Sequence, residues 1–257
     1  MEPMDEHPAV SPAAPPAEFS AASPVLTPTL VQKMLAWGVH VFTSLGLAAG
    51  FMALLAVVEH DWRTAMFWLI AALVIDGVDG TFARLVRVKE VLPRVDGKII
   101  DNVIDFVTYA FIPAVMFYEA ALVPGAWRWA LTVMILLVSA LYYGRQGMIS
   151  EDHYFVGFPV LWNLVMFYYL FVTDFGAAAY ILLTLLFAVL HFVPVKVAYP
   201  SRNARFRVPT LIVFVVLMAT MVLLVYSYPE RPLWMVVSAY ASALYFAVLA
   251  VYNTWLE

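Results

Sequence analysis

Long apolar stretches dominate the chain from Trp37 to its C-terminal end, and short polar segments separate them. About 20 apolar residues form a helix long enough to cross a bilayer. None of the stretches shows the alternation of a membrane β-strand. The pattern predicts an all-α, polytopic integral membrane protein with about eight transmembrane helices. The predicted spans are residues 37–58, 64–83, 99–118, 126–143, 157–172, 177–193, 208–226 and 233–252.

The first 32 residues differ in composition from the rest of the chain. They hold seven of its 16 prolines among alanine and serine. Such a segment buries too little apolar surface to offset the entropy of ordering. It also starts acidic, unlike a secretory signal. We therefore expect residues 1–32 to form a flexible, Pro-rich cytoplasmic tail and residues 33–257 to form a transmembrane catalytic domain.

The composition agrees with solvation by lipid. Hydrophobic residues make up 64% of the chain and charged residues 12%, with a mean hydropathy of +0.87, whereas soluble chains average about 45–50% and 25%. Soluble enzymes and DNA-binding modules are excluded, so no nucleic acid is expected as a partner. The chain has no cysteine, which excludes disulfides, thiolate nucleophiles and Cys-ligated zinc.

Lysine and arginine indicate the orientation in the membrane. With the N-terminus inside, only Arg63, Arg128 and Arg231 fall in outer segments. Positive residues concentrate on the cytoplasmic side of membrane proteins, so we expect both termini to be cytoplasmic. The residues on the predicted inner side are Lys33, Arg84, Arg87, Lys89, Arg94, Lys98, Arg145, Lys196, Arg202, Arg205 and Arg207.

Four aspartates stand at the junction of the second and third predicted spans: Asp76, Asp79, Asp101 and Asp105. A carboxylate at membrane depth costs at least ~2.5 kcal/mol on insertion scales. Spacings of three and four residues place each pair on one helix face. Pro93 interrupts the intervening stretch, so the two helices are antiparallel neighbours. All four carboxylates should converge near the cytoplasmic ends of these helices.

Converging carboxylates would repel one another unless a cation lay between them. Oxygen ligands suit Mg²⁺ or Mn²⁺, with Ca²⁺ as an alternative, and four aspartates could hold two ions for phosphoryl transfer. Gly80 and Ala83 follow Asp76 along its stripe, and Gly97 precedes Asp101 by one turn, leaving room for a ligand. Arg84 supplies a forked cation suited to phosphate oxygens.

These residues together resemble the signature of the CDP-alcohol phosphotransferase family, D-x-x-D-G-x-x-A-R followed by G-x-x-x-D-x-x-x-D. All eight fixed positions are present over about thirty residues. They are Asp76, Asp79, Gly80, Ala83 and Arg84, followed by Gly97, Asp101 and Asp105. Most of the family has eight residues between arginine and glycine, whereas twelve lie between Arg84 and Gly97 here. The longer spacer is typical of bacterial members that use choline as the acceptor.

The resemblance implies the family fold and a one-step reaction in which CDP-diacylglycerol and choline give phosphatidylcholine and CMP. It implies that Asp76, Asp79 and Asp101 ligate two Mn²⁺ or Mg²⁺ ions. Asp105 would be the general base and touch the second ion too. A homodimer in the bacterial inner membrane, with its active site open to the cytoplasm, is also implied. The expected nucleotide-binding residues are Gly80, Ala83, Arg84 and Gly97.

Choline carries a quaternary ammonium group, which aromatic faces commonly bind. Tyr109 follows Asp105 by one turn and is the predicted choline contact. Gly46 and Gly50 fit the G-x-x-x-G pattern that permits close helix approach. Three alternatives stay open: another phosphatidyltransferase using serine, inositol, glycerol phosphate or a CDP-choline donor; a carboxylate-lined transporter; and a purely structural role for the aspartates.

Overall fold

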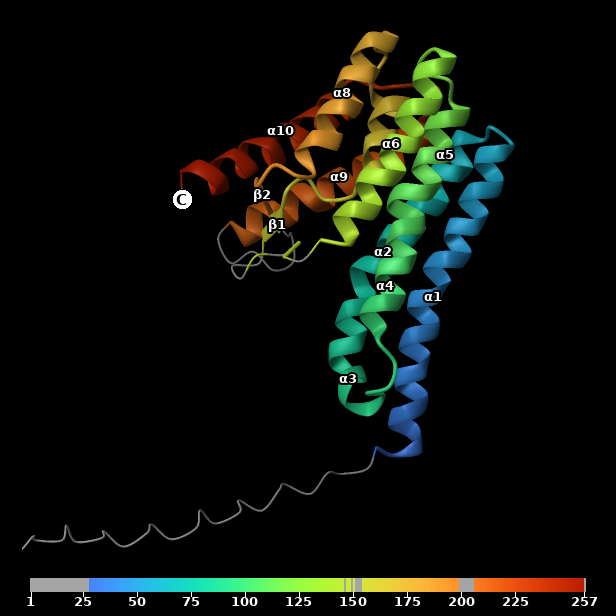
Figure 1. The fold of residues 1–257 in the computed structure, drawn as a ribbon, viewed down its shortest axis with the longest axis vertical. Helices are drawn as coiled ribbons and strands as arrows, with labels where there is room; N and C mark the ends of the chain where they lie inside the picture. Colours follow the sequence, from blue (N-terminus) through green and yellow to red (C-terminus); the bar gives the residue numbers. More distant parts are fainter. Residues whose placement is uncertain (1–27, 146, 149, 151–153, 199–205, 257) are drawn as a thin grey trace, which may run out of the picture.

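The computed structural model describes residues 28–145, 147–148, 150, 154–198 and 206–256, and nearly all of them are helical (Figure 1). The all-α prediction is confirmed. The α-helices are α1 (Leu30–Val58), α2 (Trp62–Leu85), α3 (Val88–Val91), α4 (Gly97–Asp105), α5 (Ile112–Glu119), α6 (Gly125–Tyr143), α7 (Trp162–Phe167), α8 (Ala177–Leu190), α9 (Arg207–Ser227) and α10 (Leu233–Trp255). Two π-helical segments, η1 (Phe106–Phe111) and η2 (Tyr168–Val172), continue α4 and α7. Most of the predicted tail, residues 1–32, lies outside the described residues.

Six helical segments in the described part of the chain are long and apolar enough to cross a membrane. The third of them, Gly97–Glu119, joins α4, η1 and α5 into one span. The fifth and sixth predicted spans correspond to the shorter apolar helices Trp162–Val172 and Ala177–Leu190. At about 1.5 Å per residue, both fall short of a hydrocarbon core roughly 30 Å thick. The chain is a multi-pass membrane protein, and the count of eight crossings stays a prediction.

The fifth predicted span forms the short helical segment Trp162–Val172, made of α7 and η2, which lies inside the bundle. Segment α7 packs against α2, η1 and α5, and η2 packs against α9. Trp162, Phe167 and Phe171 are fully buried there. The Trp162 indole N–H donates a hydrogen bond of 3.0 Å to the Ser139 hydroxyl of α6. This segment forms the centre of the core, which explains why its apolar residues resembled a lipid-facing span.

A small antiparallel sheet, which the hydrophobic pattern did not predict, joins two polar connections. Strand β1 (Tyr154–Val156) pairs with β2 (Lys196–Ala198). The Lys196 backbone N–H donates a hydrogen bond to the Thr254 hydroxyl at 2.8 Å, which attaches the sheet to the end of α10. The C-terminal end of α10 therefore lies beside these connections (Figure 1).

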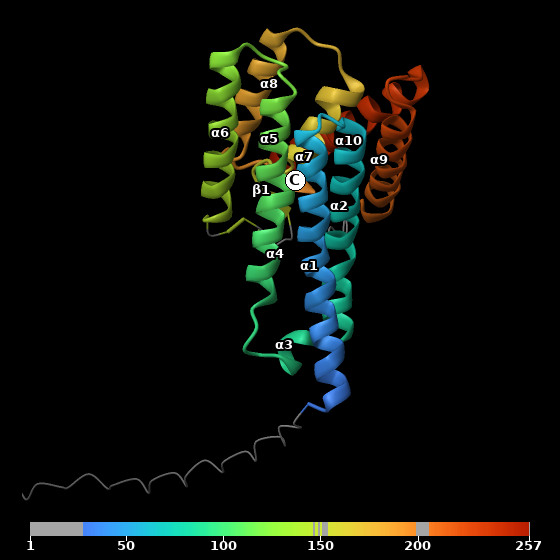
Figure 2. The same cartoon turned by 90° about the vertical axis from the view of Figure 1, so that its right-hand side faces the viewer.

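The twelve-residue spacer folds back onto α1. Its short helix α3 places Val88 and Val91 against Ala36 and Val39 of α1, and these residues form a separate apolar cluster. Figure 2 shows α3 beside the N-terminal half of α1, at the end of the bundle where α4 begins. The spacer thus covers an apolar face of α1 and then leads to Gly97.

Helix α1 approaches the third span closely at two glycines. A Cβ atom on Gly46 would lie 2.9 Å from the Ile104 Cγ2, and one on Gly50 would lie 3.1 Å from the Ile112 Cδ1. Both contacts are within one chain, so the G-x-x-x-G spacing serves the internal packing of the bundle.

The substitution Gly46→Leu should therefore destabilise the protein by about 1–3 kcal/mol through overpacking. The neighbouring atom is a β-branched methyl group of Ile104, which lies between Asp101 and Asp105 in sequence and cannot rotate freely away. Thermal unfolding in detergent measures the effect. Gly38→Leu, on the same helix with nothing within 4 Å of its Cβ position, is the matched control. Equal unfolding temperatures for the two variants would contradict the packing argument.

Candidate functional site

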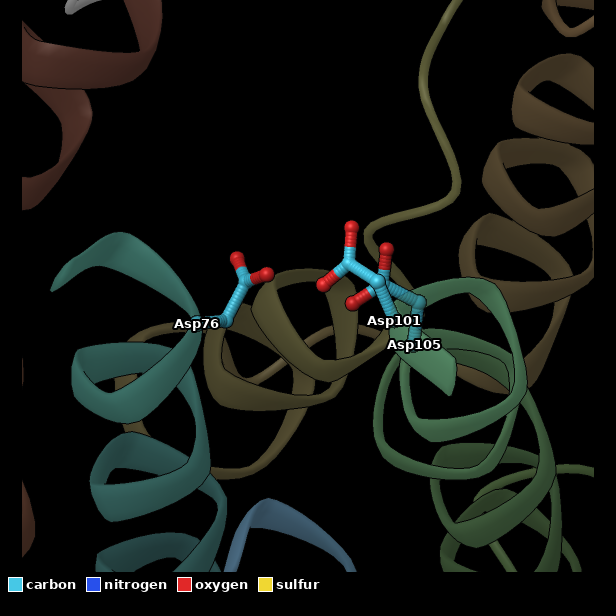
Figure 3. A group of neighbouring side chains, drawn as sticks. All are labelled: Asp76, Asp101 and Asp105. Carbon is cyan, nitrogen blue, oxygen red and sulfur yellow. The ribbon is translucent and has the colours of Figure 1, made fainter. Parts of the chain in front are cut away.

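Three of the four aspartates come together between α2 and α4. Asp76, Asp101 and Asp105 each offer a carboxylate oxygen, and these oxygens lie within 4.8 Å of one another. Figure 3 shows Asp76 on α2 pointing across the gap toward Asp101 and Asp105 on α4. All three side chains are partly buried. The carboxylates of these three residues thus converge, as the spacing predicted.

The chemistry of these donors fits a hard divalent cation. An ion bonded at about 2.1–2.4 Å to two oxygens on its opposite sides holds them roughly 4–5 Å apart, which matches the observed grouping. Among the described residues, no lysine or arginine forms an ion pair with the three aspartates, and the ion pair present is Arg87–Glu90. Because the three aspartates form no ion pair with a described lysine or arginine, a bound cation would relieve their mutual repulsion.

The fourth aspartate, Asp79, lies outside this group of three. It is 8% exposed, and its carboxyl group lies beside Thr43 of α1. Three residues of separation turn a helix by about 300°, so Asp76 and Asp79 share a broad face but point to different neighbours. Its predicted role as a metal ligand stays a prediction.

The predicted nucleotide-binding residues lie at two places near the aspartates. On the last turns of α2, a Cβ on Gly80 would lie 3.4 Å from an Arg84 guanidinium nitrogen. That guanidinium also donates a hydrogen bond to the Thr81 hydroxyl at 3.0 Å. Ala83 is half-buried and Arg84 is exposed, so the charged fork is accessible to a ligand. Gly97 is the first residue of α4.

His40 of α1 adjoins Gly97. A Cβ on Gly97 would lie 3.1 Å from the His40 Cε1. His40 is 6% exposed, and its Nε2 is buried with no hydrogen-bond partner among the described residues. A lone histidine in an apolar span gives no spacing signal, so only the fold could reveal this contact.

Glycine at position 97 has two possible purposes: it lets the nucleotide approach, or it leaves room for His40. A double substitution separates the two. If Gly97 lets the nucleotide approach, Gly97→Ala should lower CMP release, and adding His40→Ala should restore thermal stability without restoring activity. Double-mutant cycles detect such coupling between neighbours at about 0.5–3 kcal/mol. If activity returned fully in the double variant, the glycine would serve only the packing of His40.

Tyr109 belongs to η1 and lies one turn beyond Asp105. Its hydroxyl donates a hydrogen bond of 2.8 Å to Asp76 Oδ2, and its side chain is 5% exposed. The spacing predicted a position near Asp105, but the partner on α2 was not foreseen. Whether the ring contacts choline stays a prediction.

Comparisons of the sequence with known proteins identify several similar chains. A phosphatidylcholine synthase of Rhizobium johnstonii is 36% identical over 217 residues, which cover 84% of this chain and 89% of the relative. A phosphatidylcholine synthase of Pseudomonas aeruginosa is 38% identical over 221 residues, covering 84% and 92%. One from Borreliella burgdorferi is 32% identical over 202 residues, covering 77% and 84%. No family model matches the chain.

The helical bundle and its three convergent carboxylates define a multi-pass membrane protein with a candidate metal centre. The similarity extends over most of both chains and includes this acidic region. The chain belongs to the phosphatidylcholine synthase family.

Proposed function

We propose that this chain transfers the phosphatidyl group of CDP-diacylglycerol to choline, giving phosphatidylcholine and CMP. The observation that carries the proposal is the convergence of Asp76, Asp101 and Asp105 in a chain 36–38% identical to phosphatidylcholine synthases. An amphiphilic donor suits this location, because its nucleotide can enter from water while its acyl chains stay in the membrane.

The reaction requires an activated hydroxyl group and a stabilised leaving group. Asp105 accepts the proton of the choline hydroxyl, and the choline oxygen forms a bond to the phosphorus that carries diacylglycerol. The bond from that phosphorus to the bridging oxygen breaks, and CMP leaves with the electron pair. Arg84 meets phosphate oxygens of the diphosphate, while Gly80, Ala83 and Gly97 leave room for the nucleotide.

The metal centre would hold Mn²⁺ or Mg²⁺, and two ions are proposed. Asp76, Asp79 and Asp101 would bind them, with Asp105 at the second ion. Bound cations would neutralise charge on the phosphates and act as Lewis acids. The support is the all-oxygen donor set, whose aspartates form no ion pair with lysine or arginine among the described residues.

We further propose that the protein is a homodimer in the bacterial inner membrane, with both termini and the active site on the cytoplasmic side. The excess of lysine and arginine in the connections at this side supports the orientation. Helix α3 packs beside the N-terminal half of α1, so Arg87, Lys89 and Arg94 lie in the segment at the same end of the bundle as the start of α1. This placement supports a cytoplasmic N-terminus.

One assay tests the function. Purified protein is incubated with CDP-diacylglycerol, Mn²⁺ and, separately, choline, serine, inositol and glycerol phosphate, and CMP release is measured. Turnover with choline alone is the expected result. Turnover with another alcohol would assign a different acceptor. No CMP from any combination, including CDP-choline with diacylglycerol, would refute transferase activity and leave the carboxylate-lined transporter.

A further inference from the structure

A partly buried hydrogen bond connects Asp76 of α2 to the π-helical segment that continues α4. The Tyr109 hydroxyl in η1 donates to Asp76 Oδ2 in α2 at 2.8 Å, between residues 33 positions apart in the sequence. The Tyr109 side chain is 5% exposed. A hydroxyl that donates to a carboxylate forms a short, charge-assisted bond, and burial shields this one from competing water.

The bond determines which way Asp76 points. Asp76 faces Asp101 and Asp105 (Figure 3), and like charges this close repel one another. An unrestrained aspartate can rotate to another side-chain rotamer, which would take its carboxylate away from the other two. Because Tyr109 donates to Oδ2, the Asp76 carboxylate is held facing the other two aspartates.

The backbone of the third span contributes to this arrangement. The π-helical segment η1 begins at Phe106, directly after Asp105. Its wider turn changes the direction of the residues that follow, relative to a regular α-helix, and such turns often occur at functional sites. Asp101 and Asp105 face α2 from α4, and Tyr109 reaches Asp76 of α2 from the π-helical turn that follows.

We infer that Tyr109 is a positioning residue for the metal centre: its hydroxyl orients Asp76 so that Asp76, Asp101 and Asp105 can bind one cation together. The inference rests on the proposed function of these aspartates. It assigns the hydroxyl a role separate from any contact of the ring with choline. Partners that orient metal-binding carboxylates typically change metal affinity by about 10- to 100-fold when removed.

Tyr109→Phe separates the two roles, because it removes the hydroxyl and keeps the aromatic face. The full-length protein in detergent is titrated with Mn²⁺, and the rise in unfolding temperature gives the half-saturating concentration without any substrate. We expect this concentration to rise at least about tenfold in Tyr109→Phe. In the CMP-release assay, the Mn²⁺ requirement should rise likewise, while the KM for choline stays within about twofold of wild type.

Tyr169→Phe is the matched control. The Tyr169 hydroxyl is also buried and hydrogen-bonded to a side chain, the Thr184 hydroxyl at 3.1 Å, but it does not contact the aspartates. Tyr169→Phe should lower the unfolding temperature by about as much as Tyr109→Phe does, and it should leave the Mn²⁺ titration unchanged. In an Asp76→Asn background, Tyr109→Phe should add nothing to the Mn²⁺ requirement, since the hydroxyl acts through Asp76.

Three results would overturn the inference: an unchanged Mn²⁺ titration in Tyr109→Phe, an equal change in Tyr169→Phe, or a wild-type chain that Mn²⁺ does not stabilise. A higher KM for choline with an unchanged Mn²⁺ titration would also overturn it and assign Tyr109 to the acceptor. If the Mn²⁺ effect appears but wild type releases no CMP with choline, the positioning role stands and the proposed function fails.

Discussion

Asp105→Asn is expected to abolish turnover. Asparagine has nearly the same shape as aspartate but cannot accept the proton of the acceptor hydroxyl, and proton transfer by a positioned base contributes about 10²- to 10⁴-fold. Two carboxylates of the cluster, Asp76 and Asp101, remain, so Mn²⁺ should still raise the unfolding temperature, at a higher concentration. CMP release and the Mn²⁺ titration together measure both effects.

Asp96→Asn provides the control for this change. Asp96 caps the start of α4, and its carboxylate accepts hydrogen bonds from the Lys98 and Ile99 backbone N–H groups. Asparagine is an equally good N-cap residue, so this variant should keep wild-type activity. Turnover near wild type in Asp105→Asn would remove Asp105 from the role of general base.

Asp76→Ala is expected to lower activity by about 10³-fold or more, because metal binding in such reactions is worth several kcal/mol. Asp76 is the member of the described cluster that comes from α2, so its loss leaves both remaining carboxylates on α4. The stabilisation by Mn²⁺ should weaken or disappear. Activity assays across Mn²⁺ concentrations and thermal unfolding provide the measurements.

A comparison with Asp76→Asn identifies the cause of any loss of stability. Alanine leaves the buried Tyr109 hydroxyl without its acceptor, at a cost of about 1–3 kcal/mol, whereas asparagine keeps an acceptor oxygen. Without metal, Asp76→Asn should therefore be the more stable variant, since repulsion is relieved and the hydrogen bond is kept. Asp174→Ala, at an exposed position in a connecting segment, is the control. Full activity of Asp76→Ala with excess chelator would refute the metal centre.

Much of the fold could be predicted from hydrophobic length alone. Six of the predicted spans correspond to helices long enough to cross a bilayer. The segment at Trp162 was harder, because an apolar helix buried inside protein has the same composition as one that faces lipid. The paired strands at Tyr154 and Lys196 have three residues each, too few for alternation to be visible.

The site could be predicted as far as the spacing of residues along a helix determines the direction of their side chains. The spacing predicted that all four aspartates on the two antiparallel helices would converge; Asp76, Asp101 and Asp105 do, whereas Asp79 lies outside this group. Contacts between distant segments could not be predicted in this way. The hydrogen bond from Tyr109 to Asp76 and the packing of His40 against Gly97 depend on how three helices cross, which no local spacing specifies.

The π-helical segment η1 makes the third span tolerant of losing one residue within it. A π-helical turn holds about one residue more than an α-helical turn, so removing one residue from Phe106–Phe111 would return the segment to a regular α-helix and leave both flanks nearly in place. Asp101 and Asp105 would still face α2, and the fully buried Ile112, Met116 and Phe117 would stay in the core. The same deletion within the regular helix α4 would instead turn everything beyond it by about 100°.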